Sequence, residues 1–85
     1  MRWPLVMVHW QDSSEVSGWT VLKDWEHRGS LDCVSVGFLF ARENGNLTLV
    51  PHVAYVADDD RRQGTGMMII PEAAITAVET IREAA

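Results

Sequence analysis

Two tryptophans, Trp10 and Trp19, flank a short polar segment that contains Asp12 and Ser13. Indole rings stack on flat ligand rings, and nearby carboxylate and hydroxyl groups can hydrogen-bond the polar edge of such a ligand. This combination favours a binding site for a base or another planar ring. The alternative is that both indoles pack in the core and that Asp12 only caps a turn.

Arg42 could supply the positive charge that an anionic ring ligand needs. A guanidinium group binds phosphate through two parallel hydrogen bonds, which a lysine ammonium group cannot copy. Further candidate donors are Arg28, Arg61 and Arg62. The predicted ligand-binding set is Trp10, Asp12, Ser13, Trp19, Arg42, Asn44, Asn46 and His52.

Other reactive side chains lack the spacing that catalysis or metal binding requires. Cys33 has no Cys–His arrangement nearby, which favours a buried thiol. His9 and His52, with Asp12, could ligate a metal, but no tight histidine motif is present, and hydrogen-bonded strand histidines are favoured. The acidic run 58–60 lacks EF-hand spacing and precedes two arginines, which favours a solvated loop. With no triad, P-loop or dinucleotide fingerprint in the sequence, we expect a non-catalytic protein without metal or cofactor.

Composition indicates one small globular domain spanning residues 1–85, with 47% hydrophobic and 22% charged residues. Seven Lys and Arg residues against 12 Asp and Glu give a net charge of −5. This balance disfavours nucleic acid as the partner, because phosphate neutralisation dominates that binding. The apolar runs are far shorter than the ~20 residues of a membrane helix, and the N-terminal one is too short for a signal peptide. We therefore expect a cytoplasmic protein with no membrane association.

The elements that must position these residues are mostly strands. Apolar and β-branched residues predict a first strand over Leu5–Trp10, and alternation predicts a second over Cys33–Arg42. Asn44-Gly45 predicts a tight hairpin turn into a third strand over Leu47–Tyr55. Between the first two strands, Leu22 and Trp25 share the spacing of a short helix over 19–28.

The C-terminal third is less regular. The polar, glycine-rich segment 57–66 predicts a mobile loop, and Met67–Ile70 predicts a fourth strand that ends at Pro71. The tail from Pro71 has the spacing of an amphipathic helix. The alternative is one tight turn followed by a strand over Ile75–Ile81, which we predict because it would close the open edge of a four-stranded barrel.

Three segments resemble the Sm-like small barrels: Val36-Gly37-Phe38-Leu39, Asn44-Gly45-Asn46 with the strand after it, and Ile69 through Val78. They look like the bent second strand of that fold, its turn into the third strand, and its fourth strand, helical turn and fifth strand. The resemblance implies a mainly β protein, a five-stranded Sm-like or SH3-like barrel with one short helix between strands one and two. It also implies that the hairpin with Arg42, Asn44 and Asn46 contributes to a nucleotide pocket; the alternative is a plain turn with a solvated arginine.

The whole chain is also similar to a group of small uncharacterised bacteriophage proteins. The segments that carry this likeness are Val8-His9-Trp10-Gln11-Asp12-Ser13, Gly18-Trp19, Cys33-Val34-Ser35-Val36-Gly37-Phe38-Leu39 and Met68-Ile69-Ile70-Pro71. This resemblance implies a phage accessory protein in the host cytoplasm. We expect a homo-oligomer that sequesters a small anionic nucleotide, such as a host immune signal. The alternatives are an Sm-like RNA-binding protein and a protein-interaction or assembly module.

Overall fold

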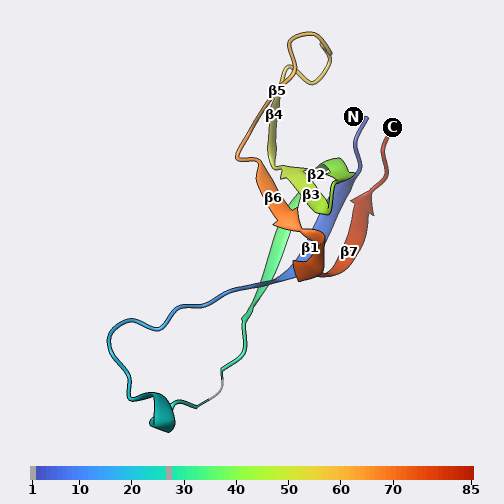
Figure 1. Cartoon of the computed structure of the whole chain (residues 1–85). Coiled ribbons are helices and arrows are strands. Elements are labelled where there is room, and N and C mark those ends of the chain that lie inside the picture. The colour runs from blue at the N-terminus through green and yellow to red at the C-terminus, as the bar shows by residue number, and fades with distance from the viewer. Residues whose placement is uncertain (1, 27) are drawn as a thin grey trace.

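The computed structural model describes residues 2–26 and 28–85, and most of their regular structure is β-strand (Figure 1). Within these residues, a five-stranded antiparallel sheet has the order β6-β3-β2-β1-β7, and β4 and β5 form a second, two-stranded sheet. The strands are β1 (Leu5–Asp12), β2 (Leu31–Glu43), β3 (Asn46–Val50), β4 (His52–Ala54), β5 (Gln63–Thr65), β6 (Met68–Pro71) and β7 (Ile75–Arg82). Two 3-10 turns, η1 (Leu22–Asp24) and η2 (Glu72–Ala74), complete the described elements.

The hairpin between β2 and β3 confirms the turn predicted at Asn44-Gly45. Asn44 has a φ of 53° and Gly45 a φ of 77°, so both central residues adopt the left-handed conformation. A two-residue turn of this kind matches the right-handed twist of the flanking strands, and asparagine and glycine are the residues that tolerate it best. Glu43 and Asn46 are therefore directly paired across the turn.

The C-terminal segment is a strand, as predicted against its local helical pattern. After the single turn η2, β7 pairs antiparallel with β1, and Val78 lies opposite Val8. This pairing satisfies backbone groups of β1 and lets Ile75 and Val78 pack on the core. Tertiary pairing therefore outweighs the helix propensity of an alanine-rich tail.

The core lies on one side of the main sheet. Its buried cluster consists of Val6, Val8, Leu47, Leu49 and Ile70. On β2 two of the positions that face this cluster are small, since Ser35 pairs with Val8 and Gly37 with Val6. A Cβ atom added to Gly37 would lie 3.3 Å from both the Leu49 Cβ and the Val50 backbone. Glycine at this position therefore allows β2 and β3 to approach closely where β2 crosses the core.

Two finer expectations about the fold are not met. In the described part of the chain, β6 and β7 are the two edges of the main sheet, so the sheet is open and no closed barrel forms. Among the described residues of segment 19–28, which exclude residue 27, η1 is the only regular element, and the helix expected there was wrong. A helix of this length needs a packing surface, and this segment projects away from the sheet (Figure 1). None of the described helical turns has the length and apolarity that a membrane crossing requires.

Two boundaries also differ from the sequence expectation. Pro51 separates β3 from β4, so the predicted third strand is divided between the two sheets. The predicted mobile loop 57–66 contributes β5, which pairs with β4. The result is a second hairpin that extends from the main sheet on the side opposite to segment 13–30 (Figure 1).

Candidate ligand-binding site

Trp10, predicted as one wall of a ligand site, lies on the core side of β1. Its indole is half-buried, packs against the core cluster, and donates a hydrogen bond from Nε1 to the Ser35 Oγ at 3.0 Å. A tryptophan with its N–H satisfied inside the protein is anchored as part of the fold. The structure therefore agrees with the core alternative for this residue.

Trp19 lies far from Trp10, in a projecting segment that we call the arm (residues 13–30). Its residue exposure is 105%, the value of a side chain that touches nothing around it. Asp12 and Ser13 lie at the base of the arm, where the Asp12 Oδ1 accepts a hydrogen bond from the Ser13 backbone N–H at 2.8 Å. Within one chain, the two indoles therefore do not flank a common site.

Arg42 is held by a carboxylate from the η2 turn. Its Nε and a terminal nitrogen donate to the two Glu72 carboxylate oxygens at 2.6 and 3.0 Å. These hydrogen bonds lower the pKa of Glu72 and raise the pKa of Arg42, and Coulomb attraction acts in the same direction. The Glu72 backbone N–H also donates to the Gly45 carbonyl at 2.8 Å. These contacts, which we call the Arg42–Glu72 clasp, connect the β2–β3 turn to the β6–β7 turn. They also engage the Arg42 guanidinium group, which was predicted to bind a phosphate.

The remaining predicted residues are dispersed. Asn44 is a turn residue, and Asn46 donates from its side chain to the Asn44 carbonyl at 3.2 Å. His52 begins β4, on the hairpin that extends away from the arm (Figure 1). Over residues 2–26 and 28–85, no three His, Cys, Asp or Glu side chains gather as they would around a metal ion. His9 instead lies 3.1 Å from the Glu79 carboxylate on neighbouring β7.

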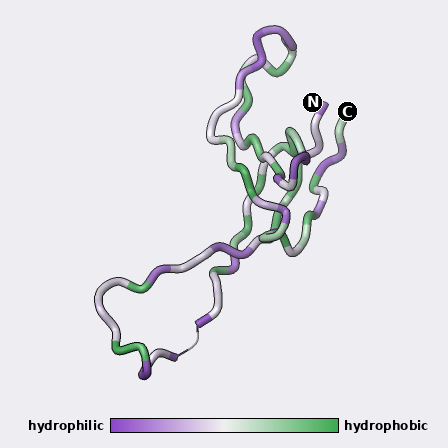
Figure 2. Tube along the Cα trace, in the orientation of Figure 1, coloured by the Kyte–Doolittle hydropathy of each residue, from purple (hydrophilic) through white to green (hydrophobic). Residues whose placement is uncertain are grey.

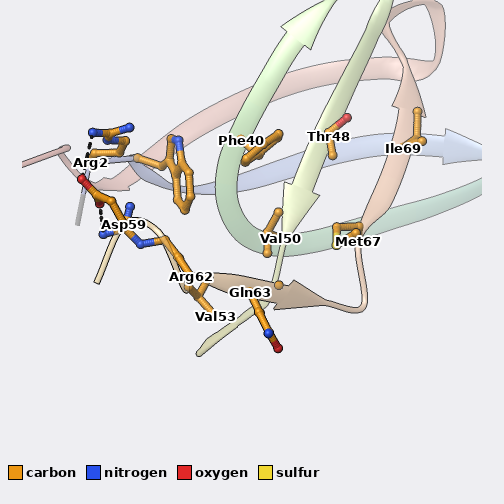
Figure 3. A pocket seen from close by; sticks show the side chains of 12 residues that line it. Arg2, Phe40, Thr48, Val50, Val53, Asp59, Arg62, Gln63, Met67 and Ile69 are labelled. Carbon is orange, nitrogen blue, oxygen red and sulfur yellow. Dashed lines mark hydrogen bonds and ion pairs between the residues drawn. The ribbon is translucent and has the colours of Figure 1, made fainter. Parts of the chain in front are cut away.

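A different cleft lies where the β4–β5 hairpin, the N-terminal segment and the main sheet meet (Figure 3). Its volume of about 480 Å³ falls within the range of small-molecule sites. The lining is mostly apolar, with two arginines and one aspartate at the rim. The lining residues are Arg2, Trp3, Phe40, Thr48, Val50, Val53, Asp59, Arg62, Gln63, Gly64, Met67 and Ile69.

The apolar part of the cleft is built on the sheet face that points away from the core. Phe40 is half exposed there, and the Trp3 ring lies against it with centroids 5.1 Å apart and planes tilted by 59°. Val50 also points to this side, yet only 4% of it is exposed. A Cβ atom on Gly64 would come within 2.8 Å of the Val50 Cγ1, so glycine lets β5 pack directly over β3. The β4–β5 hairpin thereby forms one side of the cleft, and the main sheet forms another.

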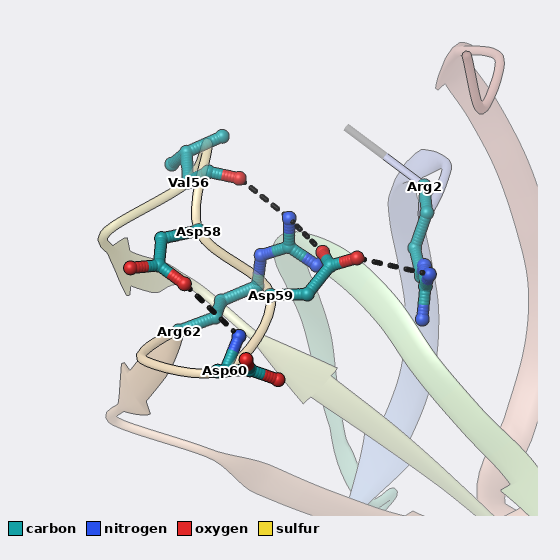
Figure 4. A network of polar contacts seen from close by, with 6 residues as sticks. All are labelled: Arg2, Val56, Asp58, Asp59, Asp60 and Arg62. Carbon is teal, nitrogen blue, oxygen red and sulfur yellow. Dashed lines mark hydrogen bonds and ion pairs between the residues drawn. The ribbon is translucent and has the colours of Figure 1, made fainter.

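At the charged rim of the cleft, the Asp59 carboxylate lies between two guanidinium groups, those of Arg2 and Arg62 (Figure 4). Arg62 contacts the Asp59 Oδ1 at 2.7 Å, and Arg2 reaches the Asp59 Oδ2 at 3.4 Å. Arg62 also donates to the Val56 carbonyl and lies over the Trp3 ring, 5.4 Å from its centroid. Its Nε is buried and has no hydrogen-bond partner among the described residues. A buried N–H donor without a partner is costly, and an acceptor from a ligand or from water would remove that cost.

Sequence reasoning identified Arg62 as a possible donor but assigned it to a mobile loop, and it gave Trp3 no role. These two residues are far apart in the chain, and only the second hairpin brings them together. A local signal was available in Pro51, which follows the end of β3, in Gly64 inside β5, and in Gly66 directly after β5. Comparison of the chain with protein-family models, curated proteins and solved structures finds no match.

Proposed function

We propose that this protein binds, without turning it over, a small anionic ligand with a planar ring, and that the ligand occupies the cleft beside Trp3 and Arg62. One observation carries the proposal: an aromatic pair and two arginines converge on an apolar cleft of about 480 Å³, where a buried donor of Arg62 has no partner in the described part of the chain. Aromatic walls suit a flat ring, and guanidinium groups suit a carboxylate or phosphate.

In this proposal the ring lies on the sheet side of the cleft and the anion at its rim. Stacking against an exposed aromatic contributes about 1–3 kcal/mol per ring. Arg2 and Arg62 already hold one anion, the Asp59 carboxylate, so their geometry is suited to a second acceptor or to a stronger one. A nucleotide combines both features, which makes it the ligand class that best fits this lining.

The wider role follows from the resemblances in the sequence. We assign the chain, whose main sheet is open at β6 and β7, to bacteriophage accessory proteins that share strand and turn features with the Sm-like small barrels, and we propose that it acts in the host cytoplasm as a homo-oligomer that sequesters a host nucleotide signal. The support is the close approach of β2 to β3 at Gly37, the Asn-Gly hairpin, and the single turn η2 before the last strand. Arg2 and Arg62 take the place of Arg42 in this proposal, because Arg42 is engaged by Glu72.

Calorimetric titration with AMP, adenosine and inorganic phosphate tests the cleft. We expect AMP to bind more tightly than adenosine or phosphate alone, since only AMP engages both the aromatic wall and the arginines. Arg2→Gln, at a side chain that is 64% exposed, should weaken AMP binding about tenfold without changing the melting temperature. Trp3→Ala should weaken AMP and adenosine to a similar extent, because it removes the surface for the ring.

Arg28→Gln is the matched control, since Arg28 lies in the arm, beside Trp25. It should leave AMP affinity within twofold of the parent chain. Equal binding of AMP by the Arg2→Gln, Trp3→Ala and parent proteins would remove the cleft from the proposal. A loss of binding in Arg28→Gln alone would place the site in the arm.

A further inference from the structure

We propose that the protein forms a symmetric dimer in which the arm of each copy packs on the main sheet of the other copy. The receiving surface, which we call the outer face, consists of Met7, Val34, Val36 and Phe38 on the side of β1 and β2 away from the core. This proposal is independent of ligand binding in the cleft.

The described residues of the arm include large apolar side chains that are exposed to solvent. Trp19 is 105% exposed, Leu22 83% and Val21 62%, and Trp25 is also exposed. No arm residue that the structure describes (13–26 and 28–30) belongs to the core or to the side chains packed against it. Figure 2 shows short hydrophobic segments in an otherwise polar or neutral arm, apart from the hydrophobic strands of the sheet. A contiguous apolar group of this kind marks an interaction surface.

The shape of the chain shows that the arm does not reach its own sheet. Asp12 and Leu31, the residues at its two ends, are paired in the sheet, so the arm leaves and returns at one point. The molecule measures 58 × 23 × 22 Å, and its radius of gyration is 17.1 Å. A compact domain of this length has a radius of gyration of about 12 Å. The difference reflects two projections from the main sheet, the arm on one side and the β4–β5 hairpin on the other, so the arm lies beyond the sheet and not across it (Figure 1).

The outer face supplies a surface of the same chemistry. The cross-strand pair Met7 and Val36 and the pair Leu5 and Phe38 place apolar side chains side by side. They point away from the core, because their neighbours Val6 and Val8 are the buried residues of β1. Val34 is 57% exposed and Val36 45%, although both are in the middle of a long strand.

The area available matches what a stable dimer needs. Fully burying a tryptophan removes about 150–250 Å² from water, so Trp19, part of Trp25 and the neighbouring aliphatic residues offer on the order of 400 Å² per arm. In a twofold dimer each arm-to-face contact occurs twice. Two arms and the faces they cover then bury about 1,600 Å², the standard size for a specific protein interface.

Sedimentation velocity tests the proposal on the full chain. The parent chain should sediment as a dimer, at twice the 9.5 kDa of one chain. The double change Trp19→Ser with Leu22→Ser, and separately Val36→Lys, should each give a monomer, because each removes one side of both contacts. These residues are exposed, so the variants should keep the strand-rich circular dichroism spectrum of the parent. Val56→Ser is the control: this valine is 45% exposed but lies outside the arm and the outer face, and the variant should remain a dimer.

A mixing experiment separates this dimer from association through other surfaces. The arm variant retains an intact outer face and the Val36→Lys variant an intact arm, so an equimolar mixture should regain part of the dimer. A monomeric parent chain overturns the proposal, as does a dimer that survives both sets of changes. Arg2→Gln should leave the dimer intact, so failure of the dimer and failure of the cleft are read out separately.

Discussion

At the scale of single residues, the ion pair between Arg42 and Glu72 has a structural role that its sequence context did not reveal. Two hydrogen bonds join the side chains, and they lower the pKa of Glu72 from its ordinary value of 4.5. A carboxyl group whose pKa is lower in the folded than in the unfolded state stabilises the fold when it is ionised. The contribution is present above pH 4.5 and is lost as the pH falls through the lower, folded-state pKa.

Replacing Glu72 should therefore have a pH-dependent effect. Glu72→Gln should unfold at a lower urea concentration than the parent chain at about pH 7, and the difference should shrink as the pH falls from 4.5 through the lower, folded-state pKa of Glu72. Urea unfolding followed by circular dichroism at several pH values measures this. Glu83→Gln, beyond the end of β7, is the control and should track the parent throughout. A Glu72→Gln deficit that is constant with pH would show that packing, and not the charge, holds the clasp.

At the scale of elements, the β2–β3 hairpin and the tail strand were predictable for different reasons. The hairpin has a local signal, since Asn44 and Gly45 both tolerate positive φ. The tail has a local pattern that indicates a helix, and only its pairing with β1 makes it β7. The arm is the reverse case: its helical spacing was present, but the element did not form because no packing surface faces it.

The hairpin turn gives a direct stability prediction. Gly45 has a φ of 77°, and an added Cβ would have open space around it, so Gly45→Ala tests conformation without a steric clash. An L-residue in the left-handed region costs about 1–2 kcal/mol relative to glycine. We expect Gly45→Ala to lower the free energy of unfolding by about that amount. Gly29→Ala, also in open space but without a positive φ, should change it by less than about 0.5 kcal/mol.

At the scale of the whole molecule, stability depends on a core that is small for the chain. The fully buried cluster draws on β1, β3 and β6, and much of the remaining apolar surface lies in the arm, the outer face and the cleft. Domains of this length have total stabilities on the order of 4–13 kcal/mol. A single core truncation therefore removes a large fraction of the stability, whereas changes in the exposed apolar surfaces affect association and binding.

Two adjacent isoleucines in β6 allow a matched comparison. Ile70 is 1% exposed and belongs to the core cluster, whereas Ile69 is 66% exposed and faces the cleft. Ile70→Ala should lower the free energy of unfolding by about 2–5 kcal/mol, through lost apolar burial and the cavity left behind. Ile69→Ala should cost less than about 1 kcal/mol. Chemical denaturation of both variants measures the difference, and equal losses would contradict the assignment of the two faces of β6.

The sequence by itself determined the strands and turns whose causes are local: the alternation in β2, the Asn-Gly turn, and the small, acidic, β-rich character of the chain. The resemblance to small barrels also led to the prediction of a tail strand where local propensity favoured a helix. Only the tertiary structure decided the candidate site. Trp3 and Arg62 meet because Gly64 lets the second hairpin pack over Val50, and Arg42 is unavailable because Glu72 reaches it across two turns. Such contacts depend on the close packing of segments distant in the chain, which local propensity and spacing do not encode.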